Sequence, residues 1–105
     1  MSSRSLRSAA RRLLAFLNDK AERHYQDVDA HMNMIMARLK DLAARNGHSL
    51  DDAEADCRSV IAFKVREWGS DEEMSKYLRP ATLFNATKFA SYHGELYKPP
   101  GGRRS

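Results

Sequence analysis

The chain is poor in the residues that build several common kinds of site. Its 105 residues include one cysteine, Cys57, which excludes an internal disulfide and a cysteine-based metal site and fits a reducing compartment. None of the five glycines has the spacing of a phosphate-binding loop or a dinucleotide-binding fingerprint. No apolar run approaches the roughly 20 residues of a membrane-spanning helix, and no segment has the pattern of a secretion signal. We therefore expect a cytoplasmic protein that makes no membrane contact.

Residues for catalysis or metal binding are also scarce. None of the four histidines has a second histidine three or four residues away, which is the helical spacing typical of zinc ligands. The acidic runs at 51–56 and 71–73 stand at predicted helix starts, where the helix dipole explains them. Cys57 lies on an apolar helical stripe, which predicts a packed core thiol. The sequence therefore predicts no enzymatic activity, no metal and no cofactor.

Positive charge is concentrated at the two ends. Of the net +4, residues 1–12 contribute +4 and residues 98–105 contribute +3, while residues 13–97 hold eleven basic and fourteen acidic side chains, a net of −3. Basic ends are typical of nucleic-acid contact and also of solvated termini. Three of the N-terminal arginines repeat at spacings of three and four, so they share one helical face. The candidate DNA contacts in this region are Arg4, Arg7, Arg11 and Arg12.

Apolar side chains spaced three and four residues apart predict three long helices, near residues 4–20, 28–45 and 50–68. Caps and helix breakers support these boundaries. The expected N-caps are Asp27 and Ser49, and the expected stops are Asn46-Gly47 and Gly69.

Shorter helices are predicted near 71–77, 80–84 and 85–94. Ser70 and Glu73 have the spacing of a capping box, Pro80 suits a first helical turn, and Asn85 suits an N-cap. Strand patterns are nearly absent. We therefore predict a single small all-α domain of three longer helices with short helical segments packed on them. It would span residues 13–97, between a basic N-terminal arm (1–12) that continues into the first helix and a flexible basic tail (98–105).

Seven of the nine aromatic residues lie between residues 63 and 97, among basic residues. Aromatic and cationic side chains together stack on bases and neutralise phosphates, but large aromatics also anchor short helices. Anchoring is the expectation for Trp68, Phe84 and Phe89, while both roles stay open for Tyr77 and Tyr97. Arg79 could contact a phosphate or, alternatively, cap helix carbonyls or pair with Asp71 or Glu67. The basic residues of this segment are Lys64, Arg66, Lys76, Arg79, Lys88 and Lys98, and the candidate DNA contacts are Lys76, Arg79 and Lys88.

The same segment resembles a known phage sequence pattern. It contains Glu67-Trp68, Met74, Tyr77-Leu78-Arg79-Pro80, Thr82-Leu83-Phe84, Lys88-Phe89 and Tyr92. This arrangement resembles the hallmark, approximately EW…M…YLRP-x-TLF…KF-x-x-Y, of the C-terminal domain of phage replisome organiser and replication initiation proteins, the conserved phage C-terminus family. Upstream, Leu17-Asn18-Asp19-Lys20 resembles the opening helix of that family. The resemblance covers about residues 13–96.

The resemblance implies a part in starting phage DNA replication in the cytoplasm of a bacterial host. The chain would be a non-enzymatic accessory domain that binds DNA, single-stranded DNA included, and helps to recruit the replicative helicase. The alternative is a protein–protein adaptor that docks on a helicase or helicase loader with little direct DNA contact, which the −3 charge of residues 13–97 favours. In the family this domain normally follows a winged-helix-type DNA-binding region, for which 105 residues leave no room.

Overall fold

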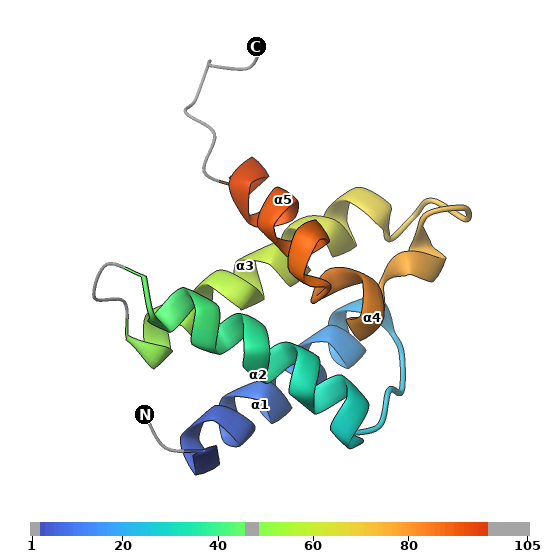
Figure 1. The fold of residues 1–105 in the computed structure, drawn as a ribbon. Coiled ribbons are helices and arrows are strands. Elements are labelled where there is room, and N and C mark those ends of the chain that lie inside the picture. Colours follow the sequence, from blue (N-terminus) through green and yellow to red (C-terminus); the bar gives the residue numbers. More distant parts are fainter. Residues whose placement is uncertain (1–2, 46–48, 97–105) are drawn as a thin grey trace.

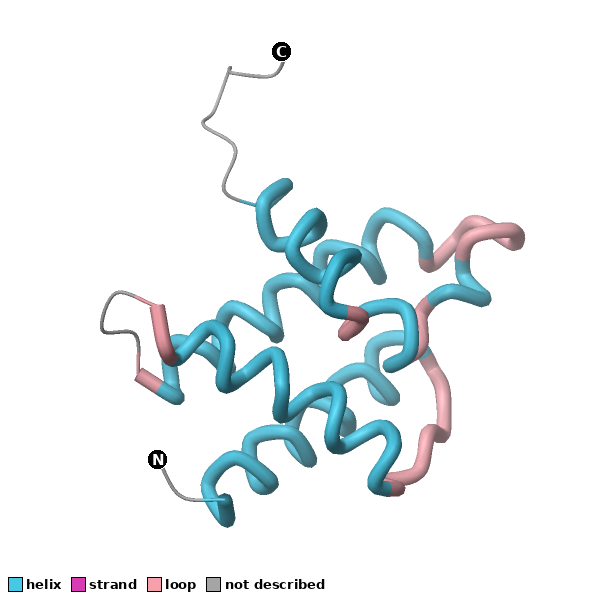
Figure 2. The backbone as a smooth tube through the Cα atoms, viewed as in Figure 1, coloured by secondary structure: helices cyan, strands magenta, loops and turns pink. Residues whose placement is uncertain are grey.

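Three long helices, α1 (Ser3–Ala21), α2 (Asp29–Ala43) and α3 (Leu50–Trp68), each pack against the other two in the computed structural model, which describes residues 3–45 and 49–96 (Figure 1). A 3₁₀ turn, η1 (Ser75–Tyr77), and the short helices α4 (Pro80–Leu83) and α5 (Ala86–Leu96) follow. Helix α4 lies against α2, and α5 lies against α3. The described chain contains helices and loops only (Figure 2), so the predicted all-α fold is confirmed.

The core lies where the three long helices meet. The predicted apolar stripes are confirmed, since Leu13, Leu17, Ile35 and Leu39 are completely buried. The first half of α1, within the stretch that the sequence separates as a basic arm, also contributes Leu6, Ala9 and Ala10 to this core. Cys57 is buried in the same core, and its burial raises the pKa of the thiol. It is therefore the unreactive core residue that its place on the apolar stripe predicts.

Local side-chain contacts set several helix ends as the sequence predicts. The Ser49 hydroxyl accepts a hydrogen bond from the Asp52 N–H (3.0 Å), and the Asp52 carboxylate accepts one from the Ser49 N–H (3.2 Å), which completes a capping box for α3. Gly69 ends that helix; a Cβ there would collide with the carbonyl oxygen of Val65. The Asn85 side chain accepts bonds from the backbone N–H groups two and three residues on, both at 3.1 Å, and so caps α5.

The second helix begins close to the predicted residue 28, but its predicted N-cap is wrong. Helix α2 begins at Asp29 after Val28, which provides no side-chain cap. The Asp27 carboxylate, the predicted cap, instead accepts a hydrogen bond from Arg11 Nε of α1 at 3.3 Å. The Asp27 side chain therefore pairs with Arg11 of α1 and does not bind the backbone N–H groups at the start of α2.

The predicted helix over 71–77 is also wrong. The chain makes a turn at 72–74 and then the 3₁₀ turn η1. The Asp71 carboxylate, rather than the Ser70 hydroxyl, accepts hydrogen bonds from the backbone N–H groups of Glu73 (2.8 Å) and Met74 (3.1 Å). Such a side-chain turn competes with helical hydrogen bonding, and Pro80 keeps Arg79 out of any helix that precedes it. The segment therefore closes in two tight turns.

Neither a membrane span nor a metal cluster occurs in the described part of the chain. It has no helix long and apolar enough to cross a membrane, and no group of three or more His, Cys, Asp or Glu side chains placed to hold a metal ion. The predicted stop at Asn46-Gly47, together with His48, Tyr97 and the predicted tail 98–105, lies outside the described residues.

Candidate functional site

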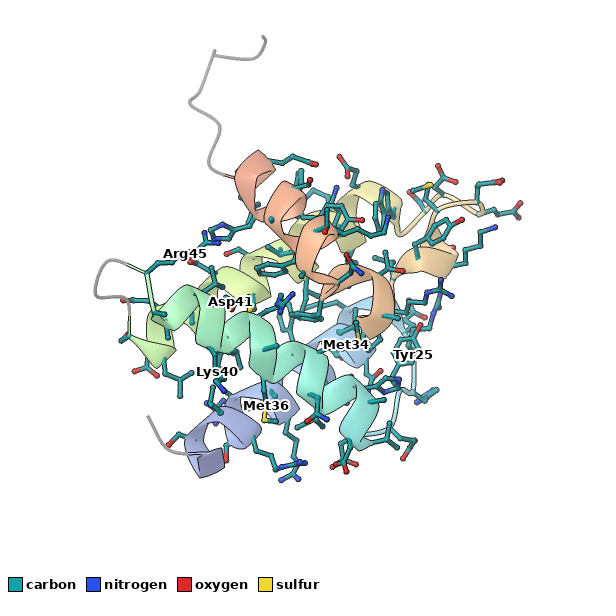
Figure 3. All side chains as sticks on the ribbon, viewed as in Figure 1. Tyr25, Met34, Met36, Lys40, Asp41 and Arg45 are labelled. Atoms are coloured by element: carbon teal, nitrogen blue, oxygen red, sulfur yellow. The ribbon has the colours of Figure 1, made fainter. Side chains whose placement is uncertain are left out.

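The loop between α1 and α2 holds the chain that follows η1 in place. The Asn18 side chain makes two hydrogen bonds with the backbone of Tyr25, at 2.9 and 2.8 Å. The Tyr25 hydroxyl, labelled in Figure 3, then donates to the carbonyl oxygen of Leu78 at 3.0 Å. Arg23 donates to the carbonyl oxygen of Ser75 at 3.1 Å. These contacts couple the end of α1 to both ends of η1, the turn that contributes Tyr77 to the site.

Residues 67–92, which we call the hallmark segment, divide between the core and the surface. Leu78, Pro80, Phe84 and Phe89 are buried. The rings of Phe84 and Phe89 are stacked, with centroids 5.8 Å apart and an interplanar angle of 17°. The anchoring expected of both phenylalanines is confirmed, and it seats α4 and α5 on the longer helices.

The other side of the hallmark segment forms a groove open to solvent, with a volume of about 290 Å³. The Trp68 ring lies edge-on to two tyrosine rings, Tyr92 at 5.6 Å and 88°, and Tyr77 at 6.5 Å and 66°. Trp68 is only half-buried, so it both packs on the core and forms a wall of this groove. We call this site the aromatic groove; its lining is Trp68, Met74, Tyr77, Arg79, Thr82, Lys88 and Tyr92.

Two cations of the aromatic groove have no acidic partner among the described residues. Arg79 has an extended backbone (φ −149°, ψ 155°) immediately before Pro80, which begins α4. Its Nε donates to the Thr82 hydroxyl at 3.1 Å, and its guanidinium lies 5.7 Å from the Tyr77 ring centroid. Within residues 3–45 and 49–96, no carboxylate pairs with Arg79 or with Lys88 of α5. The alternative pairing of Arg79 with an acid is therefore wrong.

Lys76 lies at the edge of this site. Its side chain is exposed on η1, and its Nζ is 5.3 Å from the Tyr77 ring centroid. It does not line the aromatic groove, but it adds positive charge beside it.

The buried position of Lys64 was not predicted from the sequence. In the sequence, Lys64 is one of the basic residues interleaved with the aromatic ones. In the structure, it is only 3% exposed. Its Nζ lies 2.6 Å from Glu67 Oε1 and 3.2 Å from Glu95 Oε1. It also lies 4.8 Å and 4.4 Å from the ring centroids of Trp68 and Tyr92. The spacing of Lys64, Glu67 and Trp68 by three and four residues, which puts them on one helical face, was the available signal.

The charge of Lys64 is maintained in this buried place. Burial by itself lowers the pKa of an ammonium group, but the hydrogen bonds to Glu67 and Glu95 outweigh that effect and raise the pKa of Lys64. Since Lys64 is not part of the groove lining, it contacts Trp68 and Tyr92 from the protein side. It therefore stiffens two walls of the aromatic groove and does not itself meet a ligand.

Three of the four N-terminal arginines, by contrast, are paired with acids within the protein. Arg12 makes two hydrogen bonds with Glu54 of α3, at 2.8 and 2.7 Å, and Glu54 is only 7% exposed. The side chain of Arg4 lies outside the described part of α1. The other two pairs are exposed: Arg7 with Asp29 at 3.4 Å and Arg11 with Asp27 at 3.3 Å.

The Glu54 contact predicts a loss of stability in acid. The hydrogen bonds from Arg12, and then the charges of Arg12 and Arg58, lower the pKa of Glu54 despite the opposing effect of burial. A lowered pKa stabilises the fold above about pH 4.5 and ceases to do so as the pH falls through the folded-state value. We expect Glu54→Gln to cost about 2 kcal/mol at neutral pH, the scale of hydrogen bonds to a charged group, and to flatten the fall in melting temperature in acid.

The measurement is a series of thermal melts between neutral pH and pH 3, with Glu72→Gln as the control because Glu72 is exposed in the turn before η1. An acid-side profile of Glu54→Gln identical to that of the control would contradict the prediction.

Comparison with known proteins identifies the family of this chain. No curated protein and no solved structure matches the chain. A family model described as conserved phage C-terminus matches residues 13–94, which include every residue that lines the aromatic groove. Because the match covers most of the chain, the chain belongs to the conserved phage C-terminus family.

Proposed function

We propose that the chain is a non-enzymatic accessory domain of phage DNA replication that binds DNA through the aromatic groove and works in the cytoplasm of the bacterial host. The observation that carries this proposal is that Arg79 and Lys88, without acidic partners in the described structure, line one groove with three aromatic rings. Cations that no carboxylate neutralises are available to phosphates, and neighbouring rings are available to bases.

The distribution of ion pairs favours this groove over the N-terminal arginines. Glu54 already neutralises the charge of Arg12 through two short hydrogen bonds, so Arg12 attracts a phosphate less than an unpaired cation does. Arg7 and Arg11 are in exposed pairs, which are weak and can exchange partners. These two could add to binding, but their removal should cost less than removal of the groove cations.

The test is the double variant Arg79→Ala with Lys88→Ala. Without these two phosphate-binding side chains, DNA affinity should fall about tenfold, which is about 1.4 kcal/mol. The slope of log affinity against log salt should fall by about 0.7–0.9 for each phosphate that the variant no longer neutralises. Fluorescence anisotropy with labelled DNA over a range of salt concentrations measures both quantities, after circular dichroism has shown an unchanged fold.

The matched control is Lys40→Ala with Arg45→Ala, which removes the same charge from exposed side chains. Lys40 belongs to α2 and Arg45 follows it (Figure 3), and neither lines the groove. A second comparison, Arg7→Ala with Arg11→Ala, tests the N-terminal pair and should have a smaller effect. Equal decreases in affinity for all three double variants would mean that the loss of net charge alone explains the effect. That result would contradict a specific role for the groove.

A second candidate function is the adaptor that docks on the replicative helicase or its loader. The net charge of −3 over residues 13–97 favours it, because it opposes the approach of DNA to most of the domain. If the groove variant keeps its DNA affinity but no longer associates with the helicase or loader, the adaptor replaces the DNA-binding function.

A further inference from the structure

The three rings of the aromatic groove line a site that is open to solvent. Trp68 meets Tyr92 and Tyr77 at steep angles of 88° and 66°, so the rings do not stack on one another. Lys64 contacts the Trp68 and Tyr92 rings from the buried side. The groove lies on the other side of these rings, where a flat molecule can stack on one ring and meet the edge of the next.

These walls are held in position before any ligand arrives. Trp68 ends α3 and Tyr92 belongs to α5, so the two walls come from different helices. The ion pairs of Lys64 with Glu67 of α3 and Glu95 of α5 connect those helices directly behind the rings. A preorganised pair of walls lowers the entropic cost of ordering side chains when a ligand binds.

The size of the aromatic groove is that of a small planar ligand rather than of a duplex. Its volume of about 290 Å³ lies at the lower end of small-molecule sites, which span roughly 300–1,000 Å³. Duplex DNA hides the faces of its bases in the stack, and its major groove is entered by a protruding helix or ribbon. A concave site with aromatic walls can neither reach the stacked faces of paired bases nor enter the major groove. An unpaired base, by contrast, offers its face for stacking.

Two cations line the same groove as the three rings. The hydrogen bond from Arg79 Nε to the Thr82 hydroxyl orients the guanidinium and leaves its terminal nitrogens as donors. Lys88 and Tyr92 are separated by four residues on α5, so the second cation lies on the same helical face as a ring of the groove. A strand carries a phosphate before and after each base, which matches one cation for each.

Resting on the proposed function, we infer that the aromatic groove takes a single unpaired nucleobase with its two flanking phosphates, so that the domain prefers single-stranded to duplex DNA. Trp68, Tyr77 and Tyr92 provide the stacking surface, and Arg79 and Lys88 contact the phosphates.

Trp68 is the sole tryptophan of the chain, so its fluorescence reports directly on the groove. The full chain is titrated at one salt concentration with a short oligothymidylate, a duplex, an abasic strand of equal length and inorganic polyphosphate. Anisotropy of labelled strands measures binding independently. We expect the oligothymidylate alone to quench Trp68 strongly, and to bind at least tenfold more tightly than the duplex or the abasic strand.

Variants of Tyr92 provide the second arm. Tyr92→Ala should weaken oligothymidylate binding about tenfold, whereas Tyr92→Phe, which keeps the ring, should bind like the original chain. If Tyr92→Ala does not fold, the comparison of oligothymidylate with the abasic strand on the unaltered chain still decides the matter.

The outcomes separate this inference from the function on which it rests. Equal affinity for the oligothymidylate, the abasic strand and the duplex would overturn the single-base site and leave DNA binding intact. Quenching of Trp68 by polyphosphate as strong as that by the oligothymidylate would also overturn it, because charge alone would then explain binding. Absence of binding to any DNA would remove the proposed function as well.

Discussion

Replacement of Phe84 with alanine is expected to lower the free energy of unfolding by about 3–5 kcal/mol, the usual cost of deleting a buried phenylalanine ring. Phe84 is 1% exposed and stacks on Phe89. The adjoining helix α4 has only four residues, of which Pro80, Thr82 and Leu83 are also buried, and Phe84 adds the largest buried side chain at this corner. Since small domains are stable by only about 5–15 kcal/mol, the variant should lose a large share of its stability and unfold at a clearly lower urea concentration. Urea unfolding followed by circular dichroism measures the change.

Phe16 provides the matched control for this variant. Its ring is half-buried on α1 and contacts Lys20 and Arg58 at the surface. Phe16→Ala should therefore cost only about 1 kcal/mol, since much of the ring is already in water. A cost for Phe84→Ala no greater than that for Phe16→Ala would mean that α4 is not held by this ring.

The second large effect on the free energy of unfolding is expected at Lys64, where replacement by alanine and replacement by methionine should differ. Lys64→Ala removes a buried ion pair and the aliphatic stem that packs against the rings of Trp68 and Tyr92. Breaking a buried pair typically costs about 3–5 kcal/mol. We expect a value near the lower end, about 3 kcal/mol, because the side chains of Glu67 and Glu95 are 44% and 37% exposed and can be hydrated.

Lys64→Met should be nearly neutral by comparison. Methionine restores most of the packing, and the two carboxylates that lose their partner are 44% and 37% exposed, so water can hydrate them. The same urea titration measures both variants. Equal destabilisation of the two would show that the charge, rather than the packing of the stem, holds α5 on α3. Lys64 does not line the groove but its ion pairs hold two of the groove walls, so Lys64→Met should weaken DNA binding without changing its salt dependence, and a smaller salt slope would mean that Lys64 reaches the strand.

The sequence by itself determined the features that depend on residues three or four positions apart. The three long helices, the caps at Ser49 and Asn85 and the helix start at Pro80 all follow from such local patterns, and the structure confirms them. The hallmark residues also identified the family. Local patterns succeed here because a cap or an apolar stripe needs only its near neighbours along the same helix.

The tertiary structure alone decided which charges are available and which residues form the groove. Arg12 and Glu54 are 42 residues apart, and Lys64 and Glu95 are 31 apart, so no periodicity within one helix could pair them. The same packing drew Asp27 to Arg11 and away from its predicted role as a cap. Ion pairs and burial depend on which helix faces meet, and that is set by the packing of the whole core. The sequence therefore named the aromatic and cationic residues, whereas the packing of α3, η1 and α5 gathered five of them into one groove.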